Sequence, residues 1–84
     1  RQMTALLETL VPLQEALGEL HDVDVRLQWL GQLAAQGAPA VREAARALLP
    51  EVQEERRRCA GETAREVQRW RTERLPRALR RLLG

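Results

Sequence analysis

The stretch LQEALGELHDVDVRLQWL, residues 13–30, decides the fold of this chain. Within and before it, apolar residues recur at spacings of three, four or seven, which places them on one face of a helix. These residues are Met3, Leu6, Leu10, Leu13, Leu17, Leu20, Leu27 and Leu30. The pattern predicts a first amphipathic helix over about residues 3–35. Pro12 lies inside it and has no backbone N–H, so we expect a kink or a fresh start there.

The four residues Gln-Gly-Ala-Pro, 36–39, form the one clear break in the helical pattern. Gly37 suits the C-terminal end of one helix, and Pro39 suits the first turn of the next. A second helix is therefore predicted over about residues 39–74. Its stripe consists of Val41, Ala45, Leu48, Val52, Cys59, Thr63, Val67 and Trp70.

Two residues inside the second helix work against its continuity. We expect Pro50 to kink or restart it. Gly61 costs about 1 kcal/mol relative to alanine in a helix, but the apolar stripe keeps its phase across this glycine. One long helix is the favoured interpretation, and a turn near Gly61 is the alternative. Pro76 is expected to start a short terminal helix over residues 76–83.

The predicted fold class is all-α, because no run of alternating apolar and polar residues indicates a strand. Two long helices joined by a short turn must lie antiparallel. A hairpin gives each apolar stripe only one neighbour, so we expect it to form part of a four-helix bundle. The remaining helices would come from the rest of the parent domain or from a second copy. Met3, Trp29 and Trp70 are expected to pack in that bundle.

All fourteen basic residues are arginines, and they are unevenly distributed. Residues 1–49 hold four arginines and six acidic residues, a net charge of −2, whereas residues 50–84 hold ten and six, a net charge of +4. The single cysteine, Cys59, excludes an internal disulfide and a cysteine-based zinc site, and it fits a reducing, cytoplasmic setting. No apolar run approaches the roughly 18 residues that span a bilayer, so no membrane partner is expected. The absence of an initiator methionine indicates a single fragment, residues 1–84, of a longer protein.

A polar residue interrupts the apolar stripe of the first helix at Asp24. A carboxylate on a buried stripe is costly unless it is paired, so Asp24 predicts a basic partner on a facing helix. Asp22 lies about 160° around the helix from Asp24 and cannot easily share that partner. Gly18, on the flank of the stripe, lowers helix stability, and the usual compensation is the close approach of another backbone. Gly18, Asp22 and Asp24 are therefore interpreted as structural anchors.

Residues 13–30 resemble the CHAD domain, an all-α family named for its conserved histidines. That family carries Leu-x-x-x-Leu-Gly-x-x-x-Asp-x-Asp-Val once in each of two related halves. The matching residues here are Leu13, Leu17, Gly18, Asp22, Asp24 and Val25. The segment Glu-Leu-His-Asp, residues 19–22, is more similar to the motif of the second half of that domain. The arginine-rich stretch of residues 54–58, followed by Trp70, is similar to the closing helix of the domain. The resemblance implies that residues 1–84 form the C-terminal part of such a domain.

The resemblance implies two four-helix bundles around a basic channel that binds inorganic polyphosphate, with no catalytic centre of its own. The main phosphate ligands of the family lie on helices marked His-x-x-Arg-x-x-x-Arg-Arg, a motif that is absent here. His21 is not that histidine, because Asp22 and Val23 follow it and the next arginine is Arg26. The basic partner of Asp24 would then lie on a preceding helix, outside this chain.

Three arginines are the first candidate ligands of polyphosphate in this chain. Arg58, Arg65 and Arg69 fall within about 40° of one another on a regular helix, beside the apolar stripe. The alternative is that surface ion pairs occupy them, because a glutamate stands three or four residues before each one. These glutamates are Glu54, Glu62 and Glu66.

His21 and Arg26 complete the set of candidate ligands, with an ordinary surface or interface position as the alternative for His21. One histidine cannot build a metal site, and no nucleophile stands near Asp22 or Asp24. We therefore expect no metal, no cofactor and no enzymatic activity. Nucleic acid is a poor candidate ligand, because no aromatic residues interleave with the arginines. A polyphosphate-binding module, a purely structural piece of a bundle, and a protein-interaction or oligomerisation module remain as the possible functions.

Overall fold

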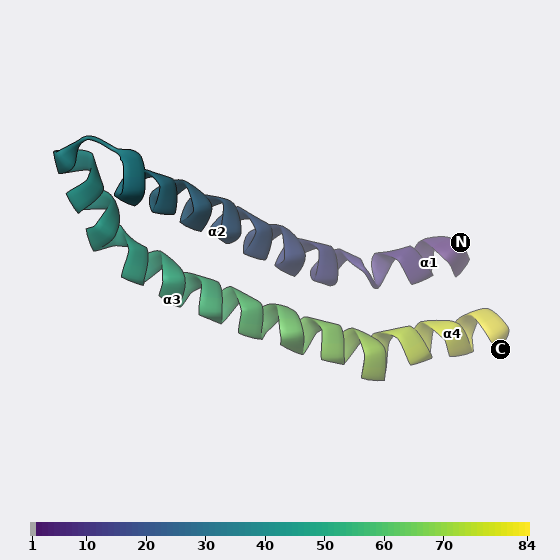
Figure 1. The fold of residues 1–84 in the computed structure, drawn as a ribbon. Coiled ribbons are helices and arrows are strands. Elements are labelled where there is room, and N and C mark those ends of the chain that lie inside the picture. The colour runs from purple at the N-terminus through teal and green to yellow at the C-terminus, as the bar shows by residue number, and fades with distance from the viewer. Residues whose placement is uncertain (1) are drawn as a thin grey trace.

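The computed structural model describes residues 2–84 of the chain as a long helical hairpin (Figure 1). Its elements are α1 (Gln2–Glu8), α2 (Val11–Gln36), α3 (Pro39–Arg69), the π-helical turn η1 (Trp70–Arg74) and α4 (Leu75–Leu83). α2 and α3 run antiparallel and side by side, and α1 and α4 lie together at the open end (Figure 1). The predicted all-α hairpin is confirmed. Membership of a four-helix bundle stays a prediction.

The first predicted helix is in fact two helices, with the break at Thr9 and Leu10. The Thr9 and Leu10 N–H groups donate to the carbonyls of Leu6 and Leu7, at 3.2 and 3.0 Å, in a tighter turn than an α-helix makes. α2 starts directly after this turn, with Pro12 in its first turn, where a missing N–H removes no helical hydrogen bond. The fresh start expected at Pro12 is confirmed.

The hairpin turn is made by two residues between α2 and α3. The Gly37 N–H donates to the Leu33 carbonyl at 3.0 Å and so caps α2. Gly37 has an extended backbone, with φ −71° and ψ 168°, and a Cβ atom there would lie 2.6 Å from the Leu33 carbonyl oxygen. The absence of a Cβ is therefore what this close turn needs, and Pro39 then opens α3 as predicted.

α3 is one continuous helix of 31 residues that passes through both Pro50 and Gly61. Of the kink or restart expected at Pro50, only the restart is wrong, and the alternative turn near Gly61 is wrong as well. Figure 1 shows the ribbon of α3 as curved but unbroken, which is how a helix accommodates one internal proline. Packing along α2 keeps the helix continuous where its own sequence weakens it.

The short terminal helix expected from Pro76 is confirmed as α4, Leu75–Leu83, with Pro76 in its first turn. No loop precedes it, because the chain does not leave the helical conformation after α3. Instead it widens over η1, where the Leu75 N–H donates to the carbonyl of Trp70, five residues back. A π-helical turn makes room for a proline ring that would clash in a regular helix. α4 then continues with Pro76 in its first turn.

The core between α2 and α3 is narrow and built from small side chains. Its fully buried valine, Val23, is 1% exposed, and Ala34 and Ala45 are the other buried apolar residues among those the structure describes. Thr63 is buried as well, and its hydroxyl donates to the Cys59 carbonyl at 2.8 Å, with the Ala16 carbonyl of α2 at 3.3 Å. Small residues at these positions let the two backbones approach closely.

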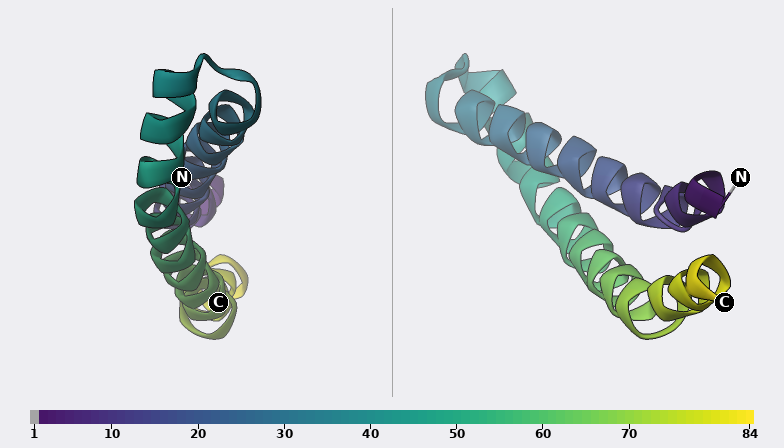
Figure 2. Two further views of the ribbon diagram at one scale, coloured as in Figure 1. Left: turned by 60° about the vertical axis from the view of Figure 1, so that its left-hand side comes forward. Right: turned by 90° about the vertical axis from the view of Figure 1, so that its right-hand side faces the viewer.

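The buried face of α2 is rotated from the one predicted. Leu17 of the predicted stripe is 48% exposed, whereas Val23 and Ala34 are buried. Trp29 of α2 and Met3 of α1, which were expected to pack in a four-helix bundle, are 67% and 60% exposed in the hairpin. Figure 2 shows the reason, because residues 2–84 form a single layer in which each long helix has one neighbour. One neighbour covers only part of a broad apolar stripe.

Candidate functional site

Two ion pairs join α2 to α3 near the middle of the hairpin. Asp24 accepts a hydrogen bond from Arg56 Nε at 2.5 Å. Arg26 donates two hydrogen bonds to the two carboxylate oxygens of Glu55, at 2.8 and 3.2 Å. Since residues two apart on a helix point about 160° from each other, the two pairs lie on opposite edges of the interface. The hydrogen bonds and the charge of Glu55 raise the pKa of Arg26, which stays protonated.

The three residues interpreted as anchors lie in different surroundings. Asp24 meets a basic residue on a facing helix, but that helix is α3, which follows α2 and does not precede it. Asp22 is exposed. Gly18 is exposed too, and a Cβ atom built on it would have no neighbour within 4 Å. No backbone in residues 2–84 makes the close approach expected at Gly18.

The predicted arginine stripe on α3 runs beside a groove that is rich in glutamate. Arg69 donates to Glu66 at 3.0 Å, as the ion-pair alternative foresaw. Arg65 and Arg69 line a cavity of about 300 Å³ between α2 and α3. The carboxylates that line it are Glu15, Glu19, Glu62 and Glu66. Four carboxylates face two guanidinium groups, so the field of this groove opposes a polyanion.

The other three predicted ligands do not converge on one place. Arg58 is exposed on α3, and Glu54, its expected neighbour, instead pairs with Arg57 at 2.6 Å. His21 is exposed on α2, and Arg26 is held by Glu55. His21 and Arg26 point about 140° apart on the helix.

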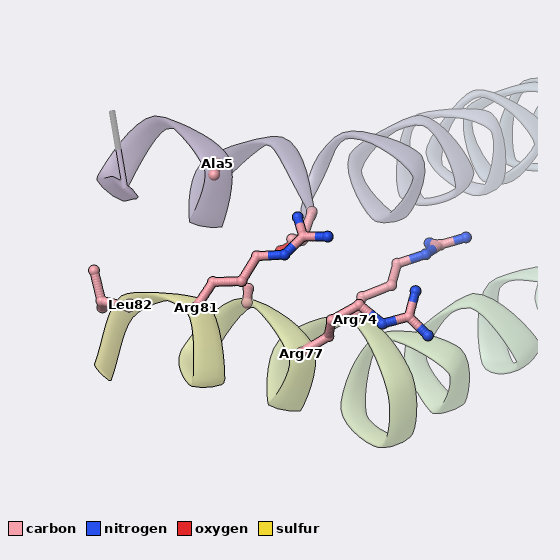
Figure 3. A pocket seen from close by; sticks show the side chains of 7 residues that line it. Ala5, Arg74, Arg77, Arg81 and Leu82 are labelled. Atoms are coloured by element: carbon pink, nitrogen blue, oxygen red, sulfur yellow. The ribbon is translucent and has the colours of Figure 1, made fainter. Parts of the chain in front are cut away.

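A second cavity, of about 460 Å³, has a different electrostatic character (Figure 3). It lies between α1 and the helical segment η1–α4, at the open end of the hairpin. Its lining consists of Ala5, Thr9, Arg74, Arg77, Ala78, Arg81 and Leu82, and holds no carboxylate. Figure 3 shows the side chain of Arg81 reaching toward α1, whereas those of Arg74 and Arg77 extend from the same side of η1 and α4 toward α2 and α3. We call this second cavity the basic cavity.

One tryptophan fixes the walls of the basic cavity. Trp70 Nε1 donates to the Thr9 hydroxyl at 3.0 Å, and that hydroxyl donates to the Leu6 carbonyl at 2.6 Å. The start of η1 is thereby tied to the turn between α1 and α2. Arg74 donates to Glu66 at 2.7 Å, outside the cavity lining, whereas no ion pair of Arg77 or Arg81 is found within residues 2–84.

Sequence reasoning missed the basic cavity as a site. The signal was present, because Arg74, Arg77 and Arg81 are spaced three and four apart and so share one helix face. What the sequence does not show is the hydrogen bond from Trp70 to Thr9, which brings α1 over that face.

Metal and membrane sites receive no support from the described part of the chain. Residues 2–84 hold no group of three or more histidine, cysteine, aspartate or glutamate side chains suited to a metal ion. Cys59 is a free, half-buried thiol. None of the described helices has both the length and the apolar character that crossing a bilayer requires.

Comparisons of the chain with models of protein families, with curated proteins and with solved structures found no match. The likeness to the CHAD domain therefore rests on residues 13–30 and the closing helix alone.

Proposed function

We propose that this chain is a non-catalytic helical module of a CHAD-like domain, that it binds inorganic polyphosphate, and that it does so through the basic cavity. One observation carries the proposal. Arg74, Arg77 and Arg81 line one cavity whose wall holds no carboxylate. The family resemblance supplies the identity of the ligand, and we further propose a cytoplasmic setting on the basis of the single cysteine.

The arrangement of charge in α4 favours an anionic ligand. Like charges at helical pair spacing repel each other by a few tenths of a kcal/mol, and Arg77 and Arg81 stand four apart. A bound anion would remove that repulsion. Arg81 also lies in the last turn, where the helix dipole favours a cation, and Arg74 is paired with Glu66, but neither explanation extends to Arg77.

Chemistry and size both suit a chain of phosphates. A guanidinium group presents paired donors that match phosphate oxygens, and its charge persists at every physiological pH. A volume of about 460 Å³ lies within the range of ligand pockets. The cavity is at the open end of the hairpin, so a long polymer could enter and leave it (Figure 1).

This proposal replaces the arginine stripe of α3 with a different set of ligands. Arg65 and Arg69 share their groove with four glutamates, which would repel a polyanion. Arg77 and Arg81 have no ion-pair partner within residues 2–84, whereas Arg74 keeps its contact with Glu66 from outside the cavity lining.

The test is polyphosphate binding by the full chain at rising salt, compared across three double variants. Arg77→Gln/Arg81→Gln removes two charges from the basic cavity. Arg58→Gln/Arg65→Gln removes two from the predicted stripe, and Arg46→Gln/Arg80→Gln removes two exposed charges from neither place, so all three change net charge equally.

We expect the cavity variant to lose the most affinity. The slope of log K against log salt should become shallower by roughly 1.5, because each phosphate contact contributes about 0.7–0.9 on nucleic acids. The other two variants should lose less than threefold at 150 mM salt, a change of under about 0.7 kcal/mol. Failure of the unmodified chain to bind, or equal losses in all three variants, would contradict the proposal.

A structural or docking role is the second candidate, and a separate observation favours it. Large apolar side chains remain exposed along both long helices, among them Leu17, Trp29 and Leu48. A hairpin that completes a bundle, while other helices bind the ligand, would show the same exposure. Binding by a longer parent protein but not by this chain would favour this candidate.

A further inference from the structure

The hairpin exposes more surface than a compact protein of its size. Its accessible surface is 6425 Å², whereas a compact monomer of 9.6 kDa is expected to expose about 5,100 Å². The excess is about 1,300 Å². The radius of gyration is 18.6 Å, against roughly 12 Å for a globular chain of this length.

The core inside one hairpin is also too small to hold it rigidly. Val23, Ala34 and Ala45 are the buried apolar side chains among the described residues, and two of these are alanines. Packing against a further surface would add the burial that the hairpin lacks.

The two broad faces of the hairpin differ in chemistry. Leu10, Leu13, Leu17 and Leu20 lie within about 40° of Asp24 around α2. Leu49, Ala60 and Val67 lie within about 40° of Arg56 around α3 and are half-buried at the edge of its contact with α2. Since Asp24 pairs with Arg56, these two groups flank the same edge of the interface. Together they form one face, which we call the Leu17 face.

The opposite face is richer in charge, although Leu48, which is 48% exposed, lies within about 20° of Glu55 around α3. It carries the Arg26–Glu55 pair and the groove lined by four glutamates and two arginines. On the Leu17 face, the Asp24–Arg56 pair is the central charged feature, and its two charges cancel. Apolar side chains surround that pair.

We propose that a second copy of this chain docks on the Leu17 face and that the two hairpins form a four-helix bundle. An interface between identical copies must be complementary to itself. A face with leucines around a neutral ion pair meets this requirement, because two copies can approach without like-charge repulsion. The glutamate-rich face does not.

The areas agree with this assembly. A stable interface buries about 800 Å² on each partner, and the hairpin exposes about 1,300 Å² beyond the compact expectation. In the bundle each long helix has two helical neighbours instead of one. The second copy takes the position of the helices that the family resemblance would place elsewhere in a longer chain.

Sedimentation equilibrium of the full chain between 1 and 200 μM tests the proposal, and it requires no polyphosphate. We expect a reversible dimer. Leu17→Glu places a carboxylate in the interface twice and should raise the dimer dissociation constant at least 100-fold. Trp29→Glu is the matched control, because Trp29 is more exposed and points about 140° from Asp24 around α2, away from the Leu17 face.

The possible results distinguish a second copy on the Leu17 face from the alternatives. A monomer at 200 μM would overturn the proposal and assign the face to helices of a longer chain. Dissociation caused by Trp29→Glu but not by Leu17→Glu would overturn it in favour of another surface. Leu17→Gln, checked for retained helix content by circular dichroism, provides a milder variant if Leu17→Glu fails to fold, and it should weaken the dimer about tenfold. A dimer that forms in Leu17→Gln as strongly as in the unmodified chain contradicts the proposal.

Discussion

The pair of substitutions Val23→Ala and Val25→Ala tests the packing of the hairpin most directly. Both residues are valines in the middle of α2, two positions apart. Val23 is 1% exposed against α3, whereas Val25 is 48% exposed on the outward side. The same chemical change is therefore made once inside the interface and once outside it.

The two substitutions are expected to change the free energy of unfolding in opposite directions, or to change it only at Val23. At Val23, two buried methyl groups are lost at about 0.8 kcal/mol each, and the cavity left behind raises the cost to about 2–3 kcal/mol. Alanine is the better helix former by about 0.5 kcal/mol, which offsets part of this loss. The net destabilisation is about 2 kcal/mol. At Val25 only the helix propensity changes, so the substitution should be neutral or stabilising by up to about 0.5 kcal/mol.

Urea unfolding followed by circular dichroism at a single fixed protein concentration measures both values. With a slope of about 1–1.5 kcal/mol per molar urea, Val23→Ala should lower the midpoint by roughly 1.3–2 M. Val25→Ala should leave it within about 0.5 M. If Val25→Ala lowers the midpoint as much as Val23→Ala does, the face of α2 that packs on α3 has been assigned wrongly.

Three further predictions follow from the hairpin geometry. Gly18→Ala should stabilise the chain by about 1 kcal/mol in thermal unfolding, because a Cβ atom at this position meets no atom within 4 Å and alanine favours the helix. Destabilisation would reveal a backbone packed against Gly18 from outside the hairpin. A double-mutant cycle of Asp24→Ala and Arg56→Ala should give a coupling of about 0.5–1 kcal/mol that falls with salt, because both side chains are 45% exposed; zero coupling at low salt would show that the pair does not form. Thr9→Val should lower the free energy of unfolding by about 1–2 kcal/mol and shift the fluorescence of Trp70, because the indole N–H loses its acceptor. The spectrum is measured in a Trp29→Phe background, and an unchanged spectrum would show that Thr9 and Trp70 do not meet.

Several parts of the fold could be read directly from residue spacing. The 3–4 periodicity predicts two long helices, and the break at residues 36–39 predicts their antiparallel arrangement. Pro12 and Pro39 were interpreted correctly because proline in a first helical turn removes no hydrogen bond. These conclusions depend only on local chemistry.

Prolines and glycines inside helices were harder to interpret because their effect depends on tertiary packing. An internal proline costs about 3 kcal/mol in an isolated helix, which predicts a kink or a restart at Pro50. α3 continues because the turns on both sides of Pro50 pack on α2, and a break would sacrifice that packing. At Pro76 the π-helical turn removes the clash without ending the helix.

The face of α2 that becomes buried could not be fixed from its own sequence. Its apolar residues cover a broad arc, and a single neighbour covers only part of it. Val23 is buried because it lies within about 20° of Ala16 and Ala34 around α2, on the side that meets α3. Ala34 is also buried there and the Ala16 carbonyl accepts from Thr63, whereas Leu17 is 48% exposed. The need of Asp24 for a cation was predictable, but three consecutive arginines, residues 56–58, could each have supplied it.

The two interhelical ion pairs matter more for register than for stability. Both are half exposed, so each contributes at most about 1 kcal/mol. A core of alanines is permissive, however, because sliding one helix by a turn of about 5.4 Å replaces one small side chain by another at little cost. Such a slip would break both pairs at once, since Asp24 and Arg26 meet neighbouring residues of α3, Arg56 and Glu55. The pairs also have opposite polarity, with the carboxylate on α2 at one edge and on α3 at the other. One alignment of the helices satisfies both, and it is the alignment that brings Thr9 and Trp70 together at the open end and so forms the basic cavity.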